Sequence, residues 1–359
     1  MKPPKLPKGA IKPRPAVLAM APYSPPTGGR ANKLRLDFNE NTVGCSPAVI
    51  AALKQNLDAG QLAVYPEYGE AKEAVARYFR VRPEQFVFTN GTDEAIQVFL
   101  NAYVDDGQEV LLLKPAYAMY RFYAQVAGAR IQEVEYPRPG MEFPLQAVLS
   151  AITPETRAVM LSNPNNPTGT GLGLLAIERI LSRARKAVVM VDEAYFEFSG
   201  VTAIAEIERV PNLFVCRTFS KVFGMAGMRL GCLFSHEANI AYLHKAQSPY
   251  SVNSLAVVAA QAAVLDTAYV ENYVAEVLAA RELLCFGLEQ LGVRYVPSSA
   301  NFVLGHFGKR AIEICDALRG QGILVRDRSY EAPGCVRITV GTREQTRRLL
   351  AALEGIWKP

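Results

Sequence analysis

The sequence predicts an α/β protein with a large lobe, built on a mainly parallel sheet flanked by helices, and a smaller α+β lobe. From about residue 86, short apolar runs alternate with longer amphipathic segments, which is typical of βα units. After about residue 268, a long helical stretch is followed by shorter apolar runs and two more helices. The 359 residues, half of them apolar, are enough to bury a large core.

The candidate strands of the large lobe are five apolar runs, each of which ends in polar residues. They are FVFTN (86–90), EVLLL (109–113), AVMLS (158–162), AVVMVD (187–192) and LFVCRTF (213–219). Helices are expected from Thr92, over about 268–291, near 309–319 and over about 342–356, with further strands in 301–307, 322–327 and 335–341. Because ligands bind at the carboxyl ends of strands in open α/β sheets, the residues after each strand are candidates for a site.

Charge and composition exclude several classes of function. The formal net charge is +5, and Lys2, Lys5, Lys8, Lys12 and Arg14 precede any acidic residue, so the rest of the chain is neutral. A neutral body argues against a nucleic-acid groove. The basic, proline-rich start is interpreted as a tail, and the apolar run AVLAMA (16–21) is too short for a signal peptide. With no stretch of 18 apolar residues, a cytoplasmic protein without a membrane span is expected.

Cysteine and histidine patterns indicate no metal site. The six cysteines form no CxxC pair and mostly lie within apolar runs, so reduced core thiols are expected. His236, His244 and His306 are scattered along the chain. The absence of HExxH and GxSxG motifs argues against a metalloprotease and a serine hydrolase.

Two strand ends offer an anion site and an aromatic face. TNGTDEAIQVFL (89–100) places Gly91, Thr92 and Asp93 at a helix start, where free backbone amides and the helix dipole favour an anion. The alternative is an ordinary helix capped by Asn90 or Thr92. After the next strand come Tyr117 and Tyr120, which could stack on a flat cofactor or simply pack in the core.

The next two strand ends present amides and a carboxylate. SNPNNPTG (162–169) holds Asn165 and Asn166 in a loop made rigid by prolines. Asp192 ends a very apolar strand, where a carboxylate is costly unless it has a cationic partner, and Tyr195 follows.

Lys221 lies in RTFSKVFGMAGMRLG (217–231), among Thr218, Ser220 and several glycines, with Arg229 eight positions on. Alone, this segment would be interpreted as a surface turn. Together with the other strand ends, it offers a nucleophilic lysine, an anion site and a buried carboxylate. Pyridoxal 5'-phosphate (PLP) needs these three parts, for its aldehyde, its phosphate and its ring nitrogen.

The ordered set NGTDEA, PAYAMY, SNPNNPTG, DEAYFEF and RTFSKVFGMAGMRLG resembles the fold-type-I PLP-dependent aminotransferases of class I/II, from about residue 20 to the end. Within them, the chain is most similar to the histidinol-phosphate aminotransferases. That finer match rests on APY (21–23), LDFNEN (36–41), YPE (65–67), GILVRD (322–327) and GCVRITVGTREQ (334–345). Thr42 and Val43 depart from the Pro-Tyr common there, which leaves the exact amino donor or acceptor open.

The resemblance implies that Lys221 forms the Schiff base with the cofactor and moves the proton. Asp192 would pair with the ring nitrogen, and Tyr117 would stack on the ring. The remaining cofactor contacts implied by the resemblance are Asn166 and Tyr195 at the phenolic oxygen, Gly91, Thr92, Asp93, Thr218, Ser220 and Arg229 at the phosphate, and Tyr65 at the phosphate of the neighbouring subunit. The last contact implies a homodimer with shared active sites.

For the substrate, the resemblance implies that Arg337 binds the α-carboxylate, with Asn166 nearby. Arg326 would face the substrate phosphate, and Tyr23 would close over the same group. The alternative for Arg326 is a salt bridge at the sheet edge with Asp327 or Glu331.

The expected activity is amino transfer between glutamate and imidazole-acetol phosphate, as in histidine biosynthesis. The alternatives are an aromatic-amino-acid aminotransferase, a threonine-phosphate decarboxylase and a PLP-binding protein without catalysis. The expected division of the chain is an N-terminal tail and arm over 1–35, a large PLP-binding domain over 60–265, and a small domain made of 36–59 and 266–359.

Overall fold

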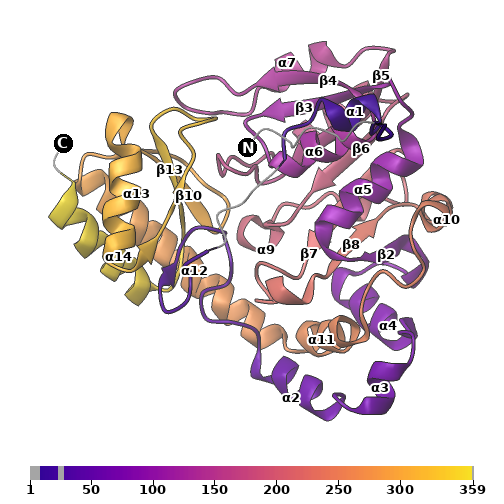
Figure 1. The fold of residues 1–359 in the computed structure, drawn as a ribbon, viewed down its shortest axis with the longest axis horizontal. Coiled ribbons are helices and arrows are strands. Elements are labelled where there is room, and N and C mark those ends of the chain that lie inside the picture. Colours follow the sequence, from indigo (N-terminus) through magenta and orange to yellow (C-terminus); the bar gives the residue numbers. More distant parts are fainter. Residues whose placement is uncertain (1–8, 23–27, 358–359) are drawn as a thin grey trace.

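The computed structural model describes residues 9–22 and 28–357. Figure 1 shows a large lobe of strands and helices on one side and a smaller sheet with helices α13 (Ala311–Gly320) and α14 (Arg343–Ile356) on the other. The long helix α12 (Thr267–Gln290) runs from the large lobe into the small one. The predicted α/β class with a second, smaller α+β unit is therefore confirmed.

A seven-stranded sheet forms the centre of the large lobe. Its order is β2 (Phe86–Thr89), β8 (Gly231–Phe234), β7 (Leu213–Thr218), β6 (Val188–Asp192), β5 (Thr156–Ser162), β3 (Glu109–Lys114) and β4 (Arg130–Glu135). Strand β8 pairs antiparallel with β2 and β7, and the other pairs are parallel. All five strands expected in this lobe are present, whereas β4 and β8 were not anticipated.

Helices cover both faces of this sheet, which explains why its central strands are apolar throughout. Met190 packs in one cluster with α5 (Gly91–Tyr103), α6 (Ala118–Val126) and α10 (Glu237–Ala246), whereas Val189 and Val191 pack in the other. Side chains alternate between the two faces of a strand, so burial of both faces requires a continuous apolar run. The second face is covered by α4 (Gly69–Phe79), α7 (Leu145–Ala151), α8 (Leu174–Arg183) and α11 (Ser254–Leu265).

The small lobe joins the C-terminal part of the chain to a segment near the N-terminus. Its antiparallel sheet has the order β12 (Arg326–Asp327), β13 (Cys335–Thr339), β10 (Phe302–His306) and β9 (Arg294–Val296). Strand β1 (Leu34–Arg35) pairs with β11 (Ile323–Leu324), which brings the following residues 36–41 to the boundary between the lobes. The other helical segments are α1 (Pro15–Leu18), α2 (Pro47–Gln55), α3 (Ala59–Ala63), α9 (Phe196–Ser199) and the 3-10 turns Pro83–Gln85, Ile204–Glu206, Ala226–Met228 and Gly308–Arg310.

All six cysteines are free thiols, as expected from their positions in apolar runs. In the described part of the chain, no single helix has the length and apolar character to cross a membrane. The bent pair α11 and α12 meets those two criteria only when its members are taken together.

Candidate active site

A cavity of about 540 Å³ lies where the carboxyl ends of the large-lobe strands meet the small lobe. Strands β5, β6 and β7 end there in Ser162, Asp192 and Thr218. This lysine cavity, named after Lys221, collects residues predicted from widely separated motifs. Those that line it are Thr92, Asp93, Tyr117, Asn166, Asp192, Tyr195, Thr218, Ser220, Lys221, Arg229, Arg326 and Arg337.

Lys221 follows β7, and its ammonium donates a hydrogen bond to the carbonyl of Phe38 at 3.0 Å. Burial and, to a smaller extent, the positive charge of Arg337 lower the pKa of this amine to about 8. A lysine held near neutrality has a substantial fraction of free amine at physiological pH. That free amine is the nucleophile in Schiff-base chemistry.

Asp192 ends β6 and is buried, with 4% of its surface exposed. Its carboxylate accepts hydrogen bonds from the Tyr120 hydroxyl at 2.6 Å and from the Ala194 amide at 3.0 Å. Burial raises the pKa of Asp192. Among the described residues, it forms no salt bridge, so the cationic partner expected from the sequence is not a side chain of the described part of the chain.

An anion cradle lies at the start of α5. Gly91 has φ of +72°, and a Cβ there would come within 2.5 Å of Arg229 Nη2, so the turn requires glycine. Asn90, one of the two capping residues considered in the alternative interpretation, does not cap the helix with its side chain. The Glu94 carboxylate instead accepts a hydrogen bond from the backbone amide of Asn90. Arg229 Nη2 lies 3.4 Å from Asp93 Oδ2, which places a guanidinium beside the first helical turn.

The tyrosines of the site are held by specific partners. The Tyr117 hydroxyl donates to Asp93 at 2.9 Å, next to the anion cradle. The Tyr195 hydroxyl accepts from Asn39 Nδ2 at 3.0 Å and from Asn166 Nδ2 at 3.4 Å. Asn39 was not predicted as a site residue, although it lies in the LDFNEN segment.

Arg337 crosses from the small lobe to the large one. Its Nη1 donates to Asn166 Oδ1 at 2.6 Å and its Nη2 to the Asp37 carbonyl at 2.7 Å, while its buried Nε has no partner in the described structure. Burial and, to a smaller extent, the positive charge of Arg328 lower the pKa of Arg337 to about 10. The guanidinium still carries its charge at neutral pH.

Arg326 lies directly opposite Arg337 in the pairing of β12 with β13. Glu331 pairs with Arg328, not with Arg326, so the structure does not show the sheet-edge salt bridge considered as an alternative. Arg328 and Arg30 also line the cavity, and sequence reasoning missed both. The i, i+2 spacing of Arg326 and Arg328 was the available signal, because alternate residues of an extended segment point to the same side.

Two predicted residues that the structure describes, Gly91 and Tyr65, do not line the lysine cavity. Tyr65 is 74% exposed and stacks on Tyr250, with ring centroids 4.4 Å apart. Tyr23 lies outside the described residues. In this single chain, the structure does not bring Tyr65 to the cavity.

The described residues fit PLP in three respects. Asp192 is a buried carboxylate without a cation, which suits a group that brings a protonated ring nitrogen. Lys221 is held close to neutrality, and the glycine turn beside Arg229 is an anion cradle. The fold and this site together define a transferase that works through a carbonyl cofactor.

The sequence model of aminotransferase class I and II matches residues 31–353, so the chain belongs to this family. The histidinol-phosphate aminotransferase of Symbiobacterium thermophilum is 37% identical over 357 residues, which are 95% of this chain and 98% of that protein. The enzyme of the same name from Roseiflexus castenholzii is 37% identical over 367 residues, or 96% and 97% of the two chains.

Solved structures show the same fold with different substrates. Histidinol-phosphate aminotransferase from Sinorhizobium meliloti, in complex with pyridoxal-5'-phosphate, has a TM-score of 0.85 and 26% identity, covering 97% of this chain and 98% of that one. Aspartate aminotransferase from Thermus thermophilus, with maleate, has a TM-score of 0.79 and 27% identity, covering 90% and 92%. The fold alone therefore does not select the substrate.

Proposed function

We propose that this chain is a PLP-dependent aminotransferase that transfers the amino group of glutamate to imidazole-acetol phosphate, giving 2-oxoglutarate and histidinol phosphate. The observation that carries the substrate assignment is the pair Arg326 and Arg337. They lie opposite each other in the sheet, both line the cavity, and neither forms a salt bridge within the described residues. Guanidinium groups arranged this way suit carboxylate and phosphate groups. The names of the relatives support the same substrate.

When bound, PLP supplies an aldehyde for Schiff-base exchange and a ring that accepts electrons from the substrate Cα. Lys221 would hold the cofactor through its amine and then move the proton between substrate and cofactor carbons. The Asp192 carboxylate would keep the ring nitrogen protonated. The hydroxyl of Tyr195 and the amide of Asn166 would hold the phenolic oxygen, and the Tyr117 ring would stack on the cofactor.

The cofactor phosphate would be held at the start of α5. The backbone amides of Thr92 and Asp93 are available there because no side chain caps the helix from Asn90. Thr218, Ser220 and Arg229 complete the group, and the Ser220 amide already donates to Thr218 Oγ1 at 3.1 Å. Gly91 contributes the turn that lets Arg229 approach.

Arg337 would bind the glutamate α-carboxylate, and its bond to Asn166 positions both groups at the reacting carbon. Arg326 would face the substrate phosphate. Tyr23 is proposed to close over that phosphate from the N-terminal arm. Because Lys221 and Arg337 are both present, a catalytic protein is favoured over a PLP-binding protein without turnover.

A homodimer is proposed from an exposed apolar patch, here called the Tyr65 patch. It consists of Leu57, Leu62, Val64, Tyr65 and Tyr250, all exposed. Tyr65 stacks on Tyr250, and the other three residues lie within eight positions of Tyr65 in the chain. Exposed apolar side chains gathered in this way favour a protein interface. There Tyr65 would reach the cofactor phosphate of the neighbouring subunit.

The domain boundaries given above stay a prediction. A cytoplasmic location also stays a prediction, and the free thiols favour it.

The proposal is tested by assaying the purified PLP-loaded enzyme in the reverse direction, with histidinol phosphate and 2-oxoglutarate, for glutamate formed, and separately with threonine phosphate for carbon dioxide released. Stoichiometric glutamate is expected, and Lys221→Ala is expected to lower kcat by about 10³-fold or more, since it removes the nucleophile and the proton carrier. Lys245→Ala, at an exposed lysine on α10, is the matched control. Carbon dioxide release from threonine phosphate without glutamate would instead indicate a decarboxylase.

A further inference from the structure

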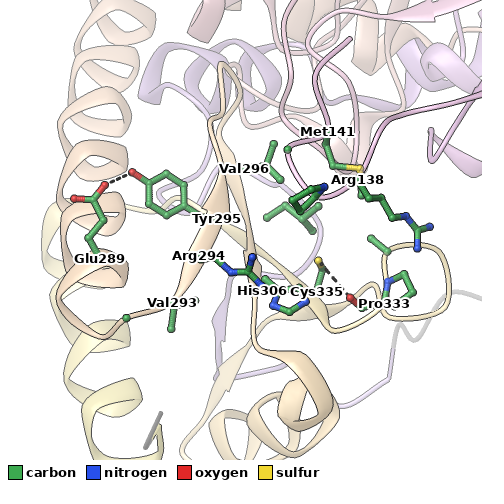
Figure 2. Close-up of a pocket in the computed structure, with 15 residues that line it drawn as sticks. Arg138, Met141, Glu289, Val293, Arg294, Tyr295, Val296, His306, Pro333 and Cys335 are labelled. Atoms are coloured by element: carbon green, nitrogen blue, oxygen red, sulfur yellow. Dashed lines mark hydrogen bonds between the residues drawn. The ribbon is translucent and has the colours of Figure 1, made fainter. Parts of the chain in front are cut away.

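A second cavity, of about 670 Å³, lies between the large-lobe loop at 138–141 and one face of the small sheet (Figure 2). It shares no lining residue with the lysine cavity. Its apolar lining includes Met141, Val293, Val296, Leu304 and Ala332. Its volume falls in the range of small-molecule sites, which combine apolar walls with a few polar groups.

Three polar side chains form a row across the sheet on the side of this cavity. Arg294 pairs with His306 in β9 and β10, and His306 pairs with Cys335 in β10 and β13. Paired residues share a face, so the three lie side by side. Figure 2 shows Arg294, His306 and Cys335 close together and Arg138 approaching from the large lobe.

The arginines of the second cavity are available to an anion. Neither Arg138 nor Arg294 forms a salt bridge among the residues that the structure describes. Arg138, Arg294 and Cys335 all line this cavity, and the charges of both arginines oppose the rise that burial causes in the pKa of the Cys335 thiol. The acidic residue of the lining, Glu289, is engaged, because the Tyr295 hydroxyl donates to it at 2.5 Å.

The second cavity is linked to the lysine cavity through two connections. Cys335 and Arg337 are two residues apart on β13 and therefore share one face of the sheet. Arg138 Nη2 donates to the Glu331 carbonyl at 2.9 Å, and Glu331 pairs with Arg328, which lines the lysine cavity. A molecule in the second cavity would therefore contact both lobes, beside residues that hold the active-site arginines.

We propose that the second cavity binds a small molecule with an apolar body and one anionic group, a carboxylate or a phosphate ester. The anion lies between Arg138 and Arg294, and the apolar body packs against Val296, Leu304 and Met141. Arginine retains several N–H donors after one hydrogen bond, so the bond of Arg138 to Glu331 does not prevent this contact. The assignment is independent of the substrate proposed for the lysine cavity.

The test uses the PLP-loaded enzyme with phenylacetate, phenyl phosphate and neutral benzyl alcohol as probes, measured by calorimetry. Tryptophan fluorescence is a second readout, because the chain has one tryptophan and Trp357 Nε1 donates to the Leu291 carbonyl, next to the lining residue Gly292. The double variant Arg138→Gln/Arg294→Gln changes two exposed side chains. It is expected to weaken binding of both anions about tenfold or more and to leave benzyl alcohol unchanged.

Two controls separate this cavity from other sites. Arg347→Gln, at an exposed arginine on α14, is expected to bind all probes as the parent does. Arg326→Gln alters the lysine cavity. This variant is expected to bind the anionic probes in the second cavity as the parent does, with the same change in Trp357 fluorescence. Tighter binding of phenylacetate would indicate a carboxylate as the occupant, and tighter binding of phenyl phosphate a phosphate ester. Anion binding that the double variant leaves unchanged, or that Arg326→Gln removes, would overturn the proposal.

Discussion

Arg337 of the small lobe donates a hydrogen bond from Nη1 to Oδ1 of Asn166 in the large lobe, at 2.6 Å. The same guanidinium is bound to the Asp37 carbonyl through Nη2. One side chain therefore links the two lobes and places a positive charge in the lysine cavity. Its charge is also among the causes of the lowered pKa of Lys221.

This relationship predicts how the lysine responds to pH. With a pKa of about 8, the Lys221 ammonium predominates at lower pH and cannot attack an aldehyde, whereas the free amine predominates at higher pH. The rate at which PLP is incorporated into the apoenzyme should rise with pH and level off above about 8. The Arg337→Gln variant should move this midpoint to higher pH, because it removes a positive charge that disfavours the ammonium.

The measurement is stopped-flow absorbance of PLP incorporation between pH 6 and about 10. Arg343→Gln, at an exposed arginine on α14, should keep the parental midpoint. A midpoint that stays the same or falls in Arg337→Gln would contradict the electrostatic link between the two residues.

Asp192→Asn should have opposite effects on the apoenzyme and the loaded enzyme. Burial raises the pKa of Asp192, so the folded apoenzyme holds this proton more tightly than the unfolded chain does and loses stability as pH rises above the ordinary carboxyl value. At pH 7 the asparagine removes this cost. Its oxygen can still accept from the Ala194 amide while its NH2 donates to the Tyr120 hydroxyl oxygen, so the apoenzyme Tm should stay the same or rise. The gain in Tm on adding PLP should shrink, and kcat should fall by about 10²-fold or more, because the ring nitrogen loses its carboxylate.

Differential scanning fluorimetry with and without PLP measures this prediction. An equal PLP-induced gain in Tm for the parent and Asp192→Asn would show that the carboxylate does not face the cofactor. Asp316→Asn, on α13, serves as a matched control.

The sequence predicts a site residue when the residue lies next to a recognisable strand, and it misses a residue that reaches the site through a long-range contact. Asp192, Lys221 and Asn166 each follow an apolar run, and parallel strands bring such positions to one edge of the sheet. Asn39 and Arg30 reach the cavity from a segment more than 100 residues away, which the pairing of β1 with β11 carries to the lobe boundary. No periodicity within residues 30–41 signals that long-range contact.

Strand β8 and the start of α5 show the limits of local patterns for the fold. Gly231–Phe234 is a short run with no amphipathic segment before it, so the βα alternation gave no reason to expect it. Asn90 has the residue type of a helix cap, yet the φ of Gly91 and the carboxylate of Glu94 determine the turn instead. Residue preference was overridden there by the geometry of the cradle.

Arg326→Gln should lower activity on a phosphorylated substrate more than it lowers activity on a substrate without a phosphate. Removal of a charge-assisted contact to a phosphate is expected to lower kcat/KM for histidinol phosphate by about 10- to 100-fold. The kcat/KM for phenylalanine, which has no phosphate, should change by less than about threefold. Steady-state kinetics with both substrates measure the ratio, and equal losses on the two would refute the assigned role.

The Tyr65 patch predicts active sites shared between subunits. Tyr65→Ala and Lys221→Ala should each inactivate the homodimer, because one lacks a cofactor contact and the other the nucleophile. In a mixed dimer, one site combines both defects and the other is intact. Unfolding and refolding the two variants together should restore about a quarter of parental activity by random pairing. Activity that stays at the level of the separate variants, in dimers verified by ultracentrifugation, would contradict sharing.

The most direct test of the proposed activity is a single-turnover experiment on the PLP-loaded enzyme. Histidinol phosphate and phenylalanine are added separately, at equal concentration, and the loss of the cofactor's absorbance band is followed by stopped flow. We predict that histidinol phosphate converts the cofactor much faster, because Arg326 faces the substrate phosphate, a group that phenylalanine lacks. An equal or faster reaction with phenylalanine would contradict the substrate assignment and indicate an aromatic-amino-acid aminotransferase.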